Sequence, residues 1–295
     1  MEKIILYYKF VPVSDPEMTR LWQIELCKNL GLKGRIIVSK QGINGTLGGN
    51  LESLKVYKSA MNASGVFRGI QYKWSEGRAD DFPKVSVKVK DELVTFRAAD
   101  EISINENGVV GGGKHLKPKQ LHKLLEERGE DVVFFDGRNK HEAMIGKFKD
   151  AVVPEVETSR DFLKEIEDSK YDEIKDKPVV TYCTGGIRCE VLSALMKNRG
   201  FKEVYQMDGG IVKYGETYGG EGEWEGKLHV FDGRMVTQFS NDAEDIGECI
   251  HCSGKTSQFL NCANKQCNKL VLVCEICADD DLCETCVVNK SLTRR

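Results

Sequence analysis

The chain has 295 residues, enough for two or three domains, and 40% of them are hydrophobic while 30% are charged. This composition excludes a disordered or collagen-like protein, and no apolar run approaches the roughly 18 residues that cross a bilayer. The N-terminal sequence MEKIILYYKF enters a strand-like pattern directly and shows no signal-peptide cleavage site. We therefore expect a cytoplasmic protein.

Charge is distributed unevenly along the chain. Residues 1–97 carry a net charge of +6, residues 98–248 carry −10 and residues 249–295 carry +1. A basic module beside an acidic one is typical of a polyanion-binding surface attached to a catalytic domain, because phosphate contacts supply most of the sequence-independent affinity for nucleic acid. The alternative is a charged face that is merely solvated.

Strand and helix signals alternate through residues 1–97. We predict strands over 4–10, 34–40, 44–49, 70–74 and 83–96, and helices over 16–30 and 50–62. Helices packed on one face of a mostly antiparallel sheet are the economical arrangement of such a series. We therefore predict an α+β, ferredoxin-like domain over residues 1–97.

Short buried strands separated by helices are predicted over residues 98–222. The predicted helices are 118–128, 139–146, 159–168 and 188–199, and the predicted strands are 131–136, 178–183 and 203–207. Continuous apolar strands such as VVFF and VVTY indicate an α/β domain whose parallel sheet is covered on both faces. Residues 223–248 are interpreted as a connection to a cysteine-rich module over 249–295.

The segment PVVTYCTGGIRCE (178–190) carries the clearest chemical signal. It places Cys183 at the carboxyl end of a buried strand, where ligands bind in open α/β sheets. Gly185 and Gly186 allow the backbone N–H groups to converge on one point, and the following helix adds its positive N-terminal end. We expect Cys183 to be a thiolate of low pKa that acts as a nucleophile.

Four other residues have more modest interpretations. Arg188 either binds an anionic substrate or braces the loop. Cys189 either resolves an oxidised form of Cys183 or fills space. Asp136 and Arg138 are predicted to lock the end of a strand through a buried ion pair.

Eight cysteines form four closely spaced pairs near the C-terminus. They are Cys249 and Cys252, Cys262 and Cys267, Cys274 and Cys277, and Cys283 and Cys286. In a reducing compartment such pairs are typical of metal ligands, and eight thiolates match two structural zinc sites. A segment this short cannot build a core of its own, so metal binding would supply its folding energy.

The pairing of these cysteines has two solutions. In the alternating one, the first pair shares a zinc with the third, and the second pair shares the other zinc with the fourth. The apolar run LVLV (270–273) favours this solution because a strand there would bring the third pair back beside the first. Sequential pairing is the alternative that spacing alone leaves open.

The pattern from Cys183 to Arg188 resembles the active-site loop of the rhodanese sulfurtransferase family, and residues 132–154 resemble its first-strand segment. Further segments narrow this resemblance to the tRNA wobble-uridine hydroxylase (TrhO) family, over nearly the whole chain. These segments are CTGGIRCE and residues 34–49, 82–96, 112–122 and 205–235.

This resemblance implies a ferredoxin-like domain, a rhodanese domain and a variable C-terminal extension. It also implies oxygen-dependent 5-hydroxylation of the wobble uridine, with Cys183 as the catalytic residue, the tRNA anticodon stem-loop as partner and molecular oxygen as co-substrate. Arg188, Gly185 and Gly186 are the expected substrate-binding residues. No organic cofactor is identifiable, since the chain has neither a GxGxxG fingerprint nor the spacing of a facial iron triad.

Plain sulfur transfer through a Cys183 persulfide, with a sulfur donor or reductant as a further partner, is the alternative activity.

Overall fold

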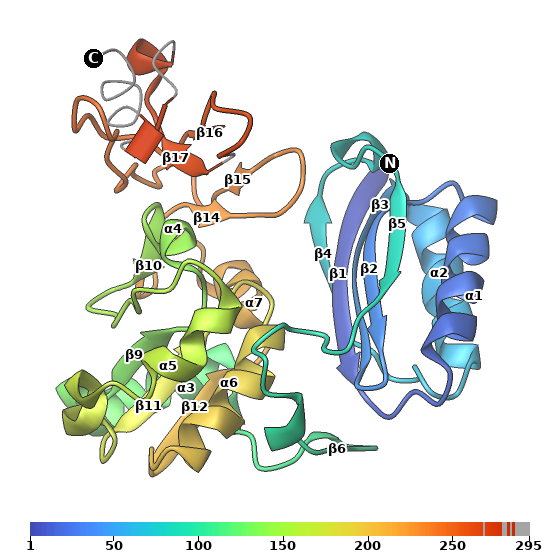
Figure 1. Cartoon of the computed structure of the whole chain (residues 1–295), viewed down its shortest axis with the longest axis horizontal. Helices are drawn as coiled ribbons and strands as arrows, with labels where there is room; N and C mark the ends of the chain where they lie inside the picture. The colour runs from blue at the N-terminus through green and yellow to red at the C-terminus, as the bar shows by residue number, and fades with distance from the viewer. Residues whose placement is uncertain (268, 279–281, 284, 287–295) are drawn as a thin grey trace.

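The computed structural model describes residues 1–267, 269–278, 282–283 and 285–286. Figure 1 shows an N-terminal sheet with its two helices, a central domain beside it, and a small cysteine-rich part above the central domain. Among the described residues, no helix is both long and apolar enough to cross a membrane.

The N-terminal domain has the predicted ferredoxin-like arrangement. Its strand order is β4-β1-β3-β2-β5, and its neighbours are antiparallel except β2 and β5. The elements are β1 (Glu2–Phe10), α1 (Pro16–Asn29), β2 (Lys33–Ser39), β3 (Gly42–Asn50), α2 (Leu51–Ala63), β4 (Tyr72–Glu76) and β5 (Val85–Val89). Both helices cover one face of the sheet (Figure 1).

The strand predicted over 83–96 is shorter in the structure and ends at Val89. The chain then leaves the sheet because its next apolar side chains belong elsewhere. Leu93 and Phe96 are buried in the core of the central domain, beside Phe162 and Leu192. The end of the predicted strand is therefore the link between the two domains.

The two faces of the N-terminal sheet differ in character. Ile5 and Tyr7 of β1 pack beneath the helices in the domain's core. Leu6 and Tyr8 alternate with them and point to the uncovered face, which is the face that carries neither helix of this domain. Residues paired directly across strands share a face, so Lys73, which pairs with Leu6, also lies on the uncovered face.

The central domain contains the predicted parallel sheet, in the order β8-β12-β11-β9. Its strands are β8 (Lys114–Leu116), β9 (Val133–Asp136), β11 (Pro178–Tyr182) and β12 (Glu203–Met207), and its helices are α3 (Pro118–Arg128), α4 (Lys140–Ala143), α5 (Phe162–Glu165), α6 (Ile187–Asn198) and α7 (Gly210–Tyr218). Apolar clusters cover both faces: Phe135 and Val179 face one cluster, and Phe134 and Val180 face the other.

Three helices of this domain differ from the sequence-based expectation. The helix predicted over 139–146 is limited to α4, because the chain continues into β10 (Gly146–Phe148), which pairs with β13 (Trp224–Gly226). The helix predicted over 159–168 consists of a short 3-10 turn and the one-turn α5. Helix α7 was not predicted, because its sequence GIVKYGETY lies among glycines.

Residues 223–248, interpreted as a connection, contribute structure to the central domain. They contain β13, β14 (Leu228–His229) and β15 (Val236–Thr237), which pairs with β14. Arg234, between these last strands, forms an ion pair with Asp232 at 2.6 Å and donates a 2.5 Å hydrogen bond to the carbonyl of Glu76. This loop therefore holds the N-terminal domain against the central one.

The remaining elements are short. They are β6 (Ile104–Asn105), β7 (Gly108–Val109), β16 (Phe259–Asn261), β17 (Leu270–Leu272), and the 3-10 helices Ala79–Asp81, Ala99–Glu101, Gly129–Asp131, Ser159–Asp161, Ser169–Ile174 and Glu275–Cys277. Strands β16 and β17 pair in antiparallel fashion within the cysteine-rich part.

Candidate active site between two domains

Cys183 follows β11 directly and is 1% exposed. Its sulfur accepts a 3.2 Å hydrogen bond from the backbone N–H of Gly186. Gly186 is the N-cap of α6 and has a φ of 96°, a left-handed conformation that favours glycine. The loop therefore turns its backbone donors and the N-terminal end of α6 toward the sulfur, as the sequence predicts.

The surroundings of Cys183 favour its charged form. Burial by itself raises the pKa of the thiol, but a hydrogen bond from Cys189, the positive charge of Arg188 and the N–H groups of both residues outweigh it. The pKa of Cys183 is therefore well below the ordinary value. Burial and the neighbouring Cys183 sulfur raise the pKa of Cys189, so Cys189 is a neutral thiol that donates toward a thiolate.

Side chains of the protein bind the guanidinium of Arg188. Its guanidinium makes two hydrogen bonds to the carboxylate of Glu142, at 2.6 and 2.9 Å, and a third to Thr184 at 3.2 Å. Burial raises the pKa of Glu142, but the charge of Arg188 prevails and lowers it to about 2. The ion pair therefore joins α4 to the cysteine loop and provides a fixed positive charge there.

A second buried ion pair lies close to the first. Arg138 and Asp136, both 0% exposed, pair at 2.6 Å as predicted. Arg138 also donates hydrogen bonds to the carbonyls of Glu142 and Gly146. These bonds connect the turn in front of α4 to α4 itself and to the first residue of β10, so they help to orient Glu142 toward Arg188.

The N-terminal domain covers the cysteine loop through β1. A Cβ atom on Gly185 would lie 2.6 Å from Leu6 Cδ2, and one on Gly186 would lie 3.0 Å from the Tyr8 hydroxyl. The same hydroxyl donates a 2.9 Å hydrogen bond to Glu190 of α6. Both glycines are thus needed for the close approach of the two domains as well as for the shape of the loop.

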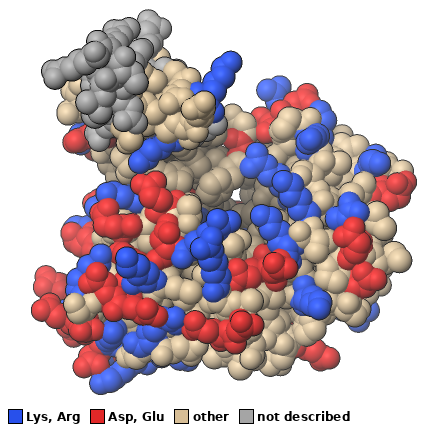
Figure 2. All heavy atoms as spheres, in the orientation of Figure 1, with Lys and Arg blue, Asp and Glu red and all other residues tan. Residues whose placement is uncertain are grey.

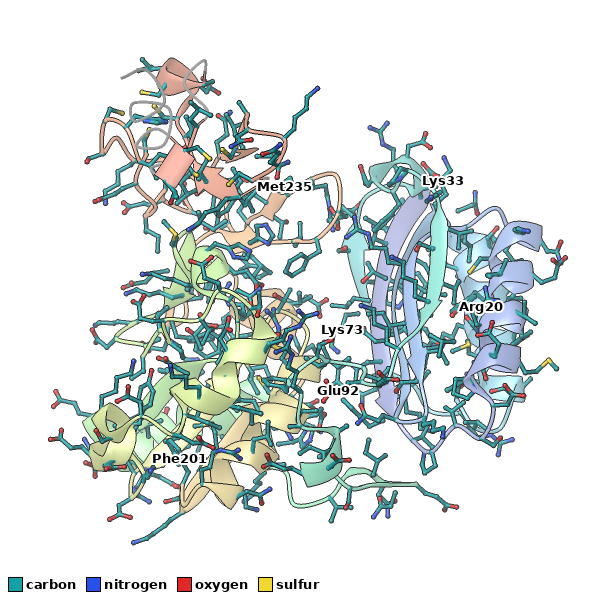
Figure 3. The ribbon with its side chains drawn as sticks, viewed as in Figure 1. Arg20, Lys33, Lys73, Glu92, Phe201 and Met235 are labelled. Atoms are coloured by element: carbon teal, nitrogen blue, oxygen red, sulfur yellow. The ribbon has the colours of Figure 1, made fainter. Side chains whose placement is uncertain are left out.

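Lys73, like Tyr8 and Glu142, is a site residue that the sequence did not predict. It lies on β4, and Figure 3 places it between the N-terminal sheet and the central domain. Its ammonium is 4.7 Å from the centre of the Tyr8 ring. The only signal in the sequence is the strand alternation that puts Lys73 on the uncovered face, and no pattern indicates that this face meets Cys183.

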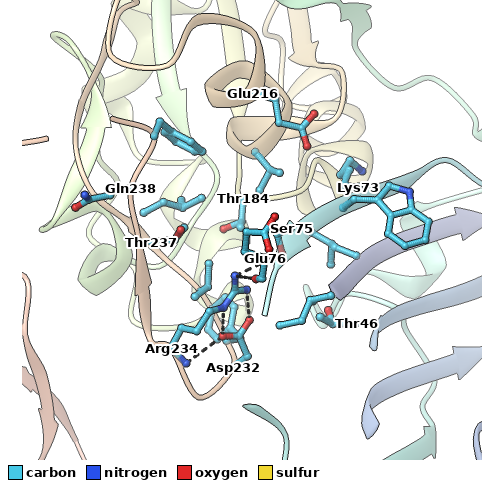
Figure 4. Close-up of a pocket in the computed structure, with 18 residues that line it drawn as sticks. Thr46, Lys73, Ser75, Glu76, Thr184, Glu216, Asp232, Arg234, Thr237 and Gln238 are labelled. Carbon is cyan, nitrogen blue, oxygen red and sulfur yellow. Dashed lines mark hydrogen bonds and ion pairs between the residues drawn. The ribbon is translucent and has the colours of Figure 1, made fainter. Parts of the chain in front are cut away.

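A cavity of about 290 Å³ opens beside the loop, between the two domains. Its wall includes Leu6 and Lys73 of the N-terminal sheet, Thr184 of the cysteine loop, and Phe231 between β14 and β15. Figure 4 shows Thr184 and Lys73 around the same space, with the Asp232–Arg234 ion pair at its edge. Figure 2 shows Lys and Arg side chains gathered around the hollow between the domains.

The eight C-terminal cysteines gather in two groups of four, and in each group the sulfurs lie within 4.8 Å of one another. The groups are Cys249, Cys252, Cys274 and Cys277, and Cys262, Cys267, Cys283 and Cys286. This is the alternating grouping rather than the sequential one. Strand β17 brings the third pair back beside the first, as the LVLV run suggests.

Close relatives are named as tRNA-modifying enzymes. A protein of Corynebacterium jeikeium (strain K411) named tRNA uridine(34) hydroxylase is 60% identical, over 96% of this chain and 92% of its own. One of Arthrobacter sp. (strain FB24) with the same name is 60% identical, over 94% and 95%. The chain belongs to the tRNA uridine(34) hydroxylase family. Coverage this complete means that these two relatives align with the N-terminal, central and C-terminal parts of this chain.

Models of three domain families match the N-terminal, central and C-terminal parts of this member of the hydroxylase family. Residues 2–93 match the UPF0176 acylphosphatase like domain, 117–217 the rhodanese-like domain and 225–289 the rhodanese C-terminal family. Among solved structures, the rhodanese-like domain of an Anabaena protein is 18% identical with a TM-score of 0.31, over 38% of this chain and 78% of that one.

Arg188 is predicted to control the charge of Cys183. Replacing it with Gln in an Arg188→Gln/Glu142→Gln double variant, which leaves no unpaired buried charge, should raise the Cys183 pKa by about 1–3 units. The measurement is the ultraviolet absorbance of the thiolate against pH, taken as the difference from a matching variant that also carries Cys183→Ser.

Arg188→Lys is the control, because it keeps the positive charge and should shift the pKa less. A Cys183 titration identical in the double variant and the parent would contradict the assignment.

Proposed function

We propose that this protein hydroxylates the wobble uridine of tRNA at C5, with molecular oxygen as co-substrate and Cys183 as the reactive group. The observation that carries the proposal is a buried thiolate at the junction of a basic domain and a rhodanese-like domain, in a chain whose relatives are named for this reaction. A thiolate stabilised in this way is a strong nucleophile.

The loop residues have separate roles in this proposal. Gly186 supplies the N–H that stabilises negative charge on sulfur, and Gly185 permits the contact with β1. Arg188 is already paired with Glu142, so we assign it a positioning and electrostatic role, and binding of an anionic substrate by Arg188 would require that pair to open. Sulfur transfer is less favoured, because the relatives are named for hydroxylation.

The N-terminal sheet is the proposed RNA-binding surface. Across neighbouring strands, Lys88 lies opposite Ile37, Ile37 lies opposite Asn44, and Asn44 lies opposite Tyr8. Residues paired in this way share a face, so Lys88 lies on the uncovered face together with Tyr8. Lys84 and Lys90 lie at even spacing from Lys88 and are exposed. A basic face that leads toward a reactive cysteine suits an anticodon stem-loop, whose bases are unstacked and whose backbone is anionic.

The C-terminal cysteines are proposed to bind two zinc ions. A tetrahedral ion with Zn–S bonds of about 2.3 Å separates its sulfurs by about 3.8 Å. The Sγ atoms of Cys252 and Cys274 are 3.6 Å apart, and those of Cys267 and Cys283 are 3.7 Å apart. All-thiolate sets of this kind are typical of structural sites, so zinc would stabilise the fold of this part.

We also propose the domain limits 1–97, 98–222 and 249–295, with 223–248 as a structured connection, and a location in the cytoplasm, where a tRNA substrate is available.

Cys183→Ser should abolish 5-hydroxyuridine formation, a loss of roughly 10³-fold or more, because serine has no thiolate to react. The measurement is nucleoside mass spectrometry of tRNA from cells that lack this protein and carry the variant. Wild-type levels of 5-hydroxyuridine would refute the catalytic assignment.

Cys189→Ser is the companion variant, because a hydroxyl can still donate to the Cys183 sulfur. Retained activity would fit a donor role for Cys189, whereas a complete loss would make it a reaction partner.

Reversing the charge of Lys84, Lys88 and Lys90 to Glu should weaken tRNA binding and flatten its salt dependence, by about one unit of slope for each lysine that contacts a phosphate. Binding is measured by fluorescence anisotropy across a salt titration. Lys55→Glu on α2 is the control, since it lies on the helical side of the domain. If the triple variant behaved like this control, the face would be merely solvated.

Metal analysis of the purified protein should find about two zinc ions per chain. Chelation should unfold the cysteine-rich part and leave the central domain folded, because only the former depends on metal for a core. Circular dichroism with limited proteolysis would follow both parts. Eight freely titrating thiols and no bound metal would exclude the zinc sites.

A further inference from the structure

The interdomain cavity has the dimensions and walls of a small-ligand site. Its volume of about 290 Å³ lies near the lower limit of typical pockets, about 300–1,000 Å³, which suits one nucleoside better than a large cofactor. Ile4, Leu6, Val212 and Val230 make much of its wall apolar. The site exists only where both domains and the 228–239 segment meet.

Lys73 supplies an unsatisfied donor to this cavity. Within the part of the chain that the structure describes, no carboxylate forms an ion pair with Lys73 and no acceptor takes a hydrogen bond from it, although the side chain is half-buried. Burial lowers its pKa, and the negative charges of Cys183, Asp208 and Glu190 act in the opposite direction. The Tyr8 ring lies beside this ammonium, but a ring accepts no conventional hydrogen bond. A half-buried ammonium with no hydrogen-bond acceptor is costly, so this arrangement indicates an acceptor that arrives with the ligand.

Phe231 supplies an exposed aromatic surface to the same cavity. Its ring is 50% exposed, although large apolar side chains are normally buried. Its ring centre is 4.9 Å from that of the buried His229 and 5.9 Å from the Arg188 guanidinium. The loop that carries it is fixed by the Asp232–Arg234 ion pair and by a hydrogen bond from Gly233 to Asp81. The loop therefore fixes the position of the ring while leaving half of its surface accessible to a ligand.

We infer that this cavity receives the uracil base of the target nucleotide after it leaves the anticodon stack, with Lys73 donating to a uracil carbonyl oxygen and Phe231 covering one face of the ring. The inference rests on the proposed function. Uracil has flat apolar faces and two carbonyl acceptors, which match an apolar wall, an aromatic ring and one cation, Lys73, that has no ion pair, since the other cation of the wall, Arg234, is paired with Asp232. Thr184 lines the cavity and directly follows Cys183, so a bound base lies next to the cysteine loop.

Photo-crosslinking tests the position of the base directly. An anticodon stem-loop RNA with 4-thiouridine at the wobble position is bound to the full-length protein, irradiated, and the crosslinked peptides are mapped by mass spectrometry. Crosslinks to Phe231 or to its neighbours on the 228–239 segment and β4 are expected. Crosslinks confined to other parts of the protein, such as the cysteine-rich part, would overturn the inference.

Two variants test the assigned contacts. Phe231→Ala and Lys73→Met should each lower the rate of single-turnover hydroxylation at least about fivefold and reduce the crosslink in the cavity. The affinity for the whole stem-loop should change less than about twofold, because contacts to the RNA backbone supply most of that affinity. Met144→Ala and Lys55→Gln are matched controls outside the cavity. Phe231→Ala with wild-type hydroxylation and crosslinking would contradict the role of the ring.

Thermal unfolding separates ligand binding by Lys73 from a structural role. Lys73→Met removes a cation that has no ion-pair or hydrogen-bond partner among the described residues, and methionine can still pack against the Tyr8 ring. The melting temperature should therefore stay the same or rise, whereas a structural role for the charge predicts a fall.

The inference and the proposed function can fail separately. A wild-type protein that crosslinks in the cavity but forms no 5-hydroxyuridine would retain the pocket and refute the activity. One that forms 5-hydroxyuridine but crosslinks only elsewhere would retain the activity and refute the pocket.

Discussion

The buried ion pair between Arg188 and Glu142 is the contact on which the cysteine loop depends. It crosses from the first turn of α6 to α4, and the second pair, between Arg138 and Asp136, holds the turn in front of α4. Removing one partner of such a pair leaves a buried charge without compensation, which typically costs about 3–5 kcal/mol. The same cation lowers the pKa of Cys183, so the stability of the loop and the reactivity of the thiol depend on one interaction.

The second constraint is the close contact of β1 with this loop. Leu6 lies against Gly185, and Tyr8 lies against Gly186 and bonds to Glu190, so the uncovered face of the N-terminal sheet closes the site. Neither domain contains the site by itself. This explains why Lys73 and Phe231, which belong to two different segments outside the cysteine loop, both line the cavity next to Thr184.

The sequence predicted those parts of the site that are built from consecutive residues. The strand, the glycine turn and the helix around Cys183 are consecutive, so their pattern contains both the geometry and the chemistry. The cysteine groups were predictable for a similar reason, because a short strand separates the second and third pairs. Tyr8, Lys73 and Phe231 join the site only through tertiary packing, and no periodicity within a strand or loop contains that information.

The errors in the predicted secondary structure also have their cause in tertiary contacts. The segment after Asn139 has a helical pattern, but β10 gains a partner in β13, some 78 residues later in the chain, and the helix stops. Helix α7 has glycines that weaken its intrinsic propensity, yet Gly215 is needed where the Phe239 ring packs closely, since a Cβ there would lie 2.2 Å from the ring. In both cases a distant contact outweighs the local preference.

The alternating order of the cysteine pairs has a consequence for how the C-terminal part assembles. The loop closed by the first and third pairs contains the second pair, and the loop closed by the second and fourth contains the third. Closing one loop shortens the free chain that the other must order, which lowers the entropic cost of the second closure. If each cysteine group binds a zinc ion as proposed, binding of one ion therefore favours binding of the other, and few chains should hold a single ion.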